Sequence, residues 1–171
     1  MMKGNRNRKR RKKGERIVHP FELYNSFMNP AETEFKGRLY AAIRDYSEML
    51  KTYTGLKMKV DALEALARGF HPESLPDSLN AQKDERYKAD RETVKLCAES
   101  LPGKKTEIEA LLKSSFLESN QDIKQIIKMR IFQGKTWPEI SQTISPRAGK
   151  HYAWDRYNRY FKEQKAADRM G

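Results

Sequence analysis

An apolar stripe with heptad spacing, which runs from residue 35 to residue 70, constrains the fold more than any other feature of the sequence. Its members are Phe35, Leu39, Ala42, Tyr46, Met49, Tyr53, Leu56, Val60, Leu63, Ala67 and Phe70. The spacing alternates between four and three residues over five heptads, which is the period of a coiled-coil seam. We therefore expect a long helix from about Ala31 that packs this stripe against another helix.

Two structures satisfy this pattern, and the sequence leaves both open. The helix either pairs with another copy of the chain, giving a homodimer or higher oligomer, or it forms an antiparallel hairpin with a later helix of the same chain. Tyr46 and Tyr53 are bulky for a tight two-stranded seam, which favours the hairpin. Gly55 destabilises a helix by roughly 1 kcal/mol relative to Ala, so a break at Thr54-Gly55 is a further alternative.

The segments that follow the stripe also carry helical patterns. Residues 69–78 contain two prolines and should end the first helix and form a loop. A second helix is expected over residues 81–101, where Pro102-Gly103 should end it, and a third over residues 106–117. Cys97 falls on the apolar side of the second helix and should be buried. No useful length of chain alternates with a period of two, so the sequence predicts an all-α fold.

The overall charge points to a polyanionic partner. The chain of 171 residues has a formal net charge of +12 and a pI near 9.7, which is typical of proteins that bind nucleic acid or anionic membrane surfaces. No run approaches the roughly 18 apolar residues of a membrane-spanning helix. The single cysteine excludes an internal disulfide. We therefore expect a soluble protein of the reducing cytoplasm, with no membrane partner.

The positive charge is concentrated in residues 1–16, which hold nine Lys or Arg residues and one Glu, a net charge of +8. We expect a disordered basic arm that contacts DNA phosphates, although a merely solubilising tail fits the same residues. Its candidate phosphate contacts are Arg8, Lys9, Arg10 and Arg11. Residues 17–30 are too apolar for a free linker and should either pack on the body of the protein or dock a partner, of which packing is favoured.

The C-terminal third contains the signals of three successive helices. A helical apolar pattern begins near Asn120, with Asp122 favourable in its first turn, and Gly134 should end that helix. Thr136 and Glu139 have the spacing of a capping box, which predicts that a short second helix starts there. The inner face of this second helix should consist of Trp137, Ile140 and Ile144.

A third helix should begin between Ser145 and Lys150 and run to about Glu163. Helix, glycine turn, short helix, turn and longer helix is the layout of a helix-turn-helix, whose last helix enters the major groove of DNA. The expected inner stripe of the last helix is Ala153, Trp154, Tyr157, Tyr160 and Phe161. The side chains expected in the core of the unit are Trp137, Trp154, Tyr157 and Phe161.

This C-terminal third resembles region 4 of sigma factors, and more closely the C-terminal segment of phage late-gene transcriptional activators of the RinA and ArpU type. The residues that carry the resemblance are Arg130, Gly134, Thr136, Trp137, Glu139, Ile140, Ile144 and the stripe from Tyr157 to Phe161. The turn before the last helix departs from the family pattern at Pro146 and Gly149. The resemblance implies promoter-directed DNA binding.

The outer face of the last helix supplies candidate DNA contacts. Basic side chains can pair with guanine and a carboxylate can accept a hydrogen bond from cytosine, whereas other basic groups fix the register on phosphates. The candidates for base edges are Arg147, Lys150, His151, Tyr152 and Asp155, and those for phosphates, besides the arm, are Lys135, Arg156, Arg159 and Lys162.

The sequence offers no constellation for catalysis. The Gly-Lys-Thr at Gly134 lacks the earlier glycine of a phosphate-binding loop, because that position is Met129. The three histidines are scattered and have no partner at metal-ligand spacing. We expect no enzymatic activity, no cofactor and no metal site.

Together these features predict a sequence-specific regulator that binds double-stranded DNA. The resemblance implies that it is a phage or prophage late-gene activator, which would act in the cytoplasm of a bacterial host. The alternatives are a small terminase subunit that assembles as a ring, and a sigma-like factor that acts only with RNA polymerase. The expected regions are a basic arm at 1–16, a helical scaffold or oligomerisation region at 17–117, a helix-turn-helix domain at 118–165 and a tail at 166–171.

Overall fold

The computed structural model describes residues 29–69 and 85–168, and every regular element within these two ranges is helical. The all-α prediction is therefore confirmed. The basic arm, residues 17–28 and the loop at 70–84 lie outside the described residues. In chain order the helices are α2 (Pro30–Gly69), α3 (Glu85–Leu111), α4 (Gln121–Ile127), α5 (Trp137–Ile144), α6 (Tyr152–Tyr160) and α7 (Lys162–Asp168). Shorter helical turns lie at Ser115–Leu117, Lys128–Phe132 and Pro146–Ala148.

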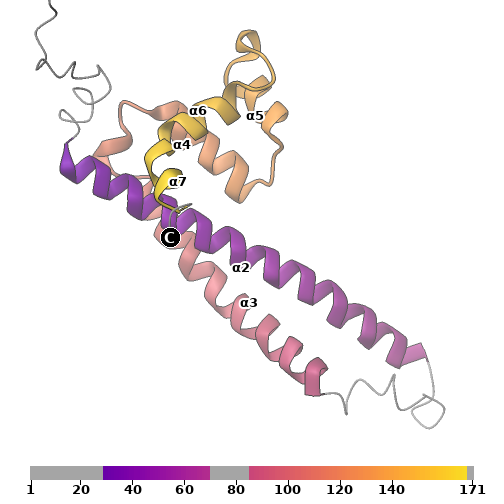
Figure 1. The fold of residues 1–171 in the computed structure, drawn as a ribbon. Coiled ribbons are helices and arrows are strands. Elements are labelled where there is room, and N and C mark those ends of the chain that lie inside the picture. The colour runs from indigo at the N-terminus through magenta and orange to yellow at the C-terminus, as the bar shows by residue number, and fades with distance from the viewer. Residues whose placement is uncertain (1–28, 70–84, 169–171) are drawn as a thin grey trace, which may run out of the picture.

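Helices α2 and α3 run side by side in opposite directions and form a long hairpin (Figure 1). The heptad stripe of α2 thus has a partner within the same chain, and the hairpin alternative is confirmed. Helix α2 is continuous through Thr54-Gly55, where the Thr54 hydroxyl donates to the Leu50 carbonyl at 2.8 Å. The free-energy cost of one exposed glycine in a helix is small compared with the stabilisation that a 40-residue helix gains from packing.

The prediction that Pro102-Gly103 ends a helix is wrong, because α3 continues through both residues to Leu111. A proline inside a helix removes one backbone hydrogen bond and costs about 3 kcal/mol. The buried side chains Cys97 and Ile108 lie on opposite sides of Pro102 along α3, and packing of one continuous apolar face offsets that cost. The expected separate helix over 106–117 is accordingly the end of α3 followed by the turn Ser115–Leu117.

The seam of the hairpin changes character along its length. Near the C-terminal helices it is apolar, with Phe35 and Leu39 of α2 and Ile108 of α3 in the main core. Toward the tip the contacts become polar, because the Tyr87 hydroxyl donates to the Glu64 carboxylate at 2.9 Å and Lys59 pairs with Asp90 across the seam. The apolar end of the hairpin, which we call its base, therefore holds the main core, and the other half projects away from the C-terminal helices (Figure 1).

The C-terminal helices pack on the base of the hairpin and share its core. Side chains of α2 and α3 form one buried cluster with those of the C-terminal helices. The Tyr40 ring of α2, for example, lies 5.5 Å from the ring of Phe161, which is fully buried. The members contributed by the C-terminal helices are Ile123, Ile126, Ile127, Ile140, Ala153, Tyr157, Tyr160 and Phe161. Within the described residues, the hairpin and the helices of the region expected at 118–165 therefore share one core.

The last helix differs from its prediction at both ends. It begins at Tyr152, after a short turn at Pro146–Ala148, and ends at Tyr160 instead of Glu163. The backbone leaves the helical region at Phe161 (φ −102°, ψ 23°), which lets α7 turn back toward α2. Asp168 of α7, in the expected tail, pairs with Arg44 of α2 at 2.5 Å.

Candidate nucleic-acid interface

The corner between α4 and α5 is built by a glycine and a capping box, as the sequence predicts. Gly134 has φ +64°, a conformation that side-chain-bearing residues rarely adopt. Thr136 is the N-cap of α5, and its backbone N–H and its hydroxyl both donate to the Glu139 carboxylate at 2.7 Å. These bonds from Thr136 lower the pKa of Glu139, so the carboxylate stays ionised at the positive end of α5.

A stack of side chains joins the same corner to α6. The Arg130 guanidinium lies 5.0 Å from the centre of the Trp137 ring and donates to the Lys135 carbonyl at 3.0 Å. The Trp137 ring lies 5.4 Å from that of Tyr157. Trp137 is half-buried and packs on the main core, as expected. This stack fixes the orientation of α5 relative to α6.

Ser141 of α5 holds the turn between α5 and α6. The residue is only 1% exposed, and its hydroxyl donates to the Lys150 carbonyl at 3.1 Å and accepts from the Ala153 backbone N–H at 3.0 Å. Gly149 in the same turn has φ +87°, which favours glycine. Sequence reasoning missed Ser141, although a polar residue beside Ile140 on the inner face of α5 was a visible signal. Ser141 sets where α6 begins.

Asp122 of α4 braces α6 from the other side. Its carboxylate accepts from the Arg156 guanidinium at 2.5 Å and from the Tyr152 hydroxyl at 3.4 Å, while Arg156 also donates to the Asn120 side-chain oxygen at 3.2 Å. Partial burial alone would raise the pKa of Asp122, but the hydrogen bonds from Arg156 and from the Ile123 N–H outweigh it and lower that pKa. Tyr152 is half-buried in this cluster, so the expectation that it points outward is wrong. Tyr152 and Arg156 hold α6 in place.

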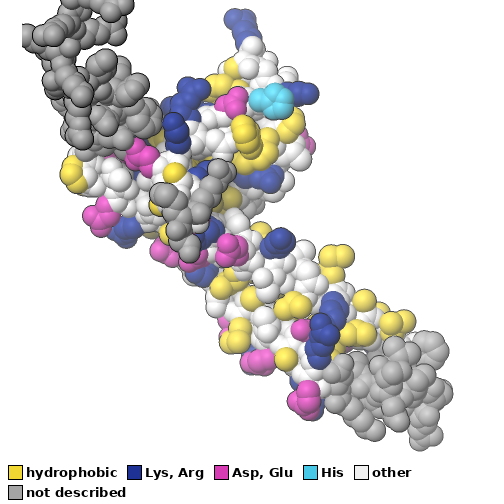
Figure 2. Space-filling model, viewed as in Figure 1, with side chains coloured by type: hydrophobic (Ala, Val, Ile, Leu, Met, Phe, Trp, Pro, Cys, Tyr) yellow, Lys and Arg dark blue, Asp and Glu magenta, His cyan; other side chains and the backbone are white. Residues whose placement is uncertain are grey.

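The remaining face of α6 and the turn before it are exposed and carry three Lys or Arg side chains and one Asp. At about 100° per residue, His151, Asp155 and Arg159 fall on one side of the helix, and all three are exposed. Arg147 and Lys150 in the preceding turn are exposed as well. Figure 2 shows Lys and Arg side chains and a histidine at this end of the molecule, away from the hairpin. We name this surface the α6 face; its members are Arg147, Lys150, His151, Trp154, Asp155 and Arg159.

Trp154 belongs to the α6 face and not to the core. Its side chain is 49% exposed, whereas Tyr157 and Phe161 on the same helical turn and the next are buried. The expectation that Trp154 lines the inner stripe is therefore wrong. At about 100° per residue, Trp154 lies at the edge between the buried and exposed sides of α6.

The other expected phosphate contacts lie around this face or outside the described residues. Lys135 is half-buried at the start of α5, and Lys162 is exposed at the start of α7. Arg8, Lys9, Arg10 and Arg11 lie in the part of the chain that the structure does not describe.

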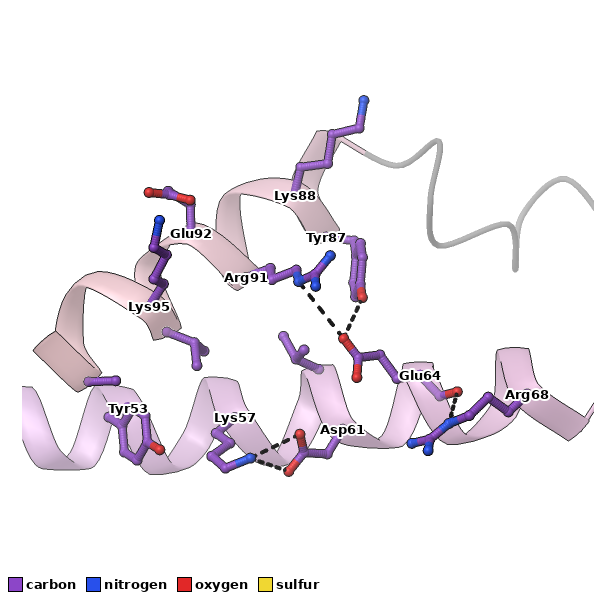
Figure 3. A pocket seen from close by; sticks show the side chains of 13 residues that line it. Tyr53, Lys57, Asp61, Glu64, Arg68, Tyr87, Lys88, Arg91, Glu92 and Lys95 are labelled. Carbon is purple, nitrogen blue, oxygen red and sulfur yellow. Dashed lines mark hydrogen bonds and ion pairs between the residues drawn. The ribbon is translucent and has the colours of Figure 1, made fainter.

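A groove of about 1070 Å³ lies between α2 and α3 near the hairpin tip (Figure 3). Its charges are largely paired, since Lys57 holds Asp61 at 2.8 Å and Glu64 accepts from Tyr87. Within residues 29–69 and 85–168, no group of His, Cys, Asp or Glu is placed to hold a metal ion. Over the same residues, no helix is long and apolar enough to cross a membrane.

Comparisons of the chain with protein-family models, with curated proteins and with solved structures gave no match. The functional interpretation therefore depends on the geometry and charge of the α6 face.

Proposed function

We propose that the chain is a sequence-specific regulator that binds double-stranded DNA, with α4, α5 and α6 acting as a helix-turn-helix and α6 as the helix that enters the major groove. The resemblance to phage late-gene activators of the RinA and ArpU type suggests its biological setting, in which RNA polymerase would be a further partner. The single observation that carries the proposal is the exposed α6 face, which has a net positive charge, on a helix that is braced from two sides.

Rigid support of α6 is what base recognition requires. A hydrogen bond to a base edge needs its donor within a few tenths of an ångström of the right place, and a loosely held helix would not provide this. Ser141 fixes the start of α6 through the Ala153 N–H, and Asp122 holds the helix through Arg156. The Ala153 N–H and the Tyr152 hydroxyl make their contacts at the N-terminal end of α6, which is where a recognition helix meets base edges.

The roles proposed for the residues follow from their exposure. Base edges would be contacted by Arg147, Lys150, His151 and Asp155, whose side chains are exposed. Phosphates would be contacted by Arg159, Lys162, Lys135 and the basic arm. We propose no DNA contact for Tyr152 and Arg156, because their polar groups already bind Asp122.

The test is selection of double-stranded DNA from a random library with the purified full chain at about 0.15 M salt, where specific and non-specific binding separate. We expect one motif to be recovered. Arg147→Ala and Lys150→Ala should then weaken binding to that motif by about 1–3 kcal/mol and should weaken binding to scrambled DNA much less. Lys51→Ala, which removes an exposed charge from α2, is the matched control and should affect both DNAs equally and slightly.

Two results would count against the proposal. Recovery of unselected DNA would leave only a non-specific electrostatic attraction. Equal losses on the motif and on scrambled DNA would remove Arg147 and Lys150 from the base contacts while leaving DNA binding itself in place.

A further inference from the structure

Trp154 is the one aromatic residue of α6 whose side chain is exposed. Tyr157 and Tyr160 of the same helix are buried, and Phe161 directly after it is fully buried. Tyr152 is half-buried and directs its hydroxyl to Asp122. The other aromatic residues of this region thus take part in packing or in the contacts with Asp122, whereas about half of the Trp154 side chain faces solvent. Aromatic side chains in such positions commonly mark contact sites.

Its neighbours indicate what kind of partner it meets. On a helix, residues three and four apart share a face, so His151 is its neighbour before and Asn158 its neighbour after. Lys150 and Arg147 precede them in the turn and are exposed, and Asp155 is the acidic exception. An exposed apolar ring on a surface that also carries the exposed Arg147 and Lys150 suits a partner that combines negative charge with small apolar groups.

Double-stranded DNA has this combination in its major groove. Phosphates line both rims, and the C5-methyl group of thymine is the one apolar feature on the base edges. A protein partner for the same basic side chains would have to be strongly acidic. The net charge of +12 gives no reason to prefer an acidic protein to nucleic acid as the partner.

We propose that Trp154 packs against a thymine C5-methyl group and makes the chain selective for thymine at one position of its DNA site. This inference rests on the proposed function, because it needs α6 to lie in the major groove. It assigns to Trp154 an apolar contact that the charged ends of the other side chains on the α6 face do not provide.

The first measurement replaces the thymines of the selected site by uracil, one at a time. Uracil lacks only the methyl group, so the comparison needs no change in the protein. Burial of one methyl group corresponds to about 0.8 kcal/mol, so uracil at the contacted position should weaken binding about fourfold. Uracil at the other positions should have little effect. Trp154→Ala should weaken binding to the thymine site and should abolish the difference between thymine and uracil at that position, whereas Trp154→Phe should retain part of it.

The second measurement uses the tryptophan fluorescence of the protein. The chain has two tryptophans, so Trp137→Phe leaves Trp154 as the only emitter while keeping an aromatic ring beside Tyr157. Addition of the selected DNA should shift or quench the emission of Trp154 strongly, and scrambled DNA of equal length should change it less. Urea unfolding of Trp154→Ala controls for folding; because the side chain is 49% exposed, the midpoint should stay near that of the unsubstituted chain.

The outcomes separate this inference from the proposed function. If no motif is selected, the proposed function fails and this inference fails with it. If a motif is bound, but uracil is tolerated at every position and the Trp154 emission does not respond to it, the DNA-binding proposal stands and the thymine contact is overturned. A uracil effect that persists in Trp154→Ala would likewise overturn it, since another residue would then read the methyl group.

Discussion

Ser141→Ala tests whether one buried hydroxyl sets the position of α6. The substitution deletes one oxygen and leaves the volume of the side chain nearly unchanged. The hydroxyl now donates to the Lys150 carbonyl and accepts from the Ala153 N–H, at 3.1 Å and 3.0 Å. After the change Lys150, which is exposed, can turn its carbonyl to water. Ala153 is fully buried, so its N–H would lose its side-chain partner without replacement.

The expected loss of stability follows from this difference between the Lys150 carbonyl, which water can reach, and the buried Ala153 N–H. An unsatisfied buried N–H costs about 1–3 kcal/mol, and the bond that water replaces costs little. We therefore expect Ser141→Ala to lower the free energy of unfolding by about 2 kcal/mol. With a urea m-value of about 2 kcal/mol per M, the unfolding midpoint should fall by about 1 M.

The assay is urea unfolding followed by tryptophan fluorescence and by circular dichroism, with hydrogen exchange of the Ala153 amide as a local probe. Trp137 and Trp154 both lie in the C-terminal helices, so their emission reports the region that the substitution affects. Thr143→Ala is the matched control on the same helix, because the Thr143 hydroxyl donates to the Glu139 carbonyl at an exposed position; its midpoint should move by a small fraction of that shift. An unchanged midpoint together with a slowly exchanging Ala153 amide would refute the reasoning.

Two further predictions concern charge. Asp122 has a lowered pKa in the folded state, so its contribution to stability is complete above the unfolded value of about 3.9 and is lost as the pH falls through the lower folded-state pKa. Asp122→Asn should therefore destabilise the chain by about 1 kcal/mol at pH 7 and should flatten the pH dependence of the urea midpoint below about pH 4; an equally steep acid loss in the variant would assign that loss to other groups. Deletion of residues 1–13 removes eight basic residues and should weaken binding to all DNA and reduce the slope of log K against log salt by about 0.9 for each phosphate that the arm neutralises in the full chain. An unchanged slope, measured with the selected DNA between about 50 and 200 mM salt, would mean that the arm binds no phosphate.

The helices were predictable from the sequence wherever a local signal decides the structure. The capping box at Thr136 and Glu139 and the positive φ of Gly134 depend on residues within a few positions of one another. The period of the α2 stripe left an intermolecular coiled coil and a hairpin both open, and the bulky tyrosines favoured the hairpin that the structure shows. Local rules failed at Pro102, where the packing of α3 on α2 outweighs the cost of an interrupted hydrogen-bond pattern.

The candidate site was predictable in outline and not in detail, because its details depend on distant partners. Asp122 and Arg156 are 34 residues apart in the chain, and nothing local indicates that they meet. Trp154 lies at the boundary between the two sides of α6, where helical periodicity alone does not determine whether a side chain is inside. In the structure the Trp154 side chain is 49% exposed.

The shared core implies that the proposed helix-turn-helix of α4, α5 and α6 does not fold independently of the hairpin base. Leu39 of α2 is fully buried in the cluster that also contains Ile123 and Phe161. Leu39→Ala should cost about 2–5 kcal/mol and, if the core is common, should shift the tryptophan transition of the C-terminal helices together with the helical signal. Leu63→Ala, which truncates a half-buried leucine in the distal half of α2 and outside that cluster, is the control and should shift both signals much less.

A fragment of residues 118–168 extends the same test. Without α2, Phe161 and its neighbours would lose the surface that covers them, and a unit of about 50 residues has little stability to spare. We therefore expect the fragment to lack a cooperative urea transition and the native tryptophan emission. The reasoning fails if the fragment unfolds cooperatively with native emission, or if the tryptophan transition of Leu39→Ala stays at the original midpoint while the helical signal shifts. Either result would mean that the C-terminal helices hold the α6 face in place without the hairpin.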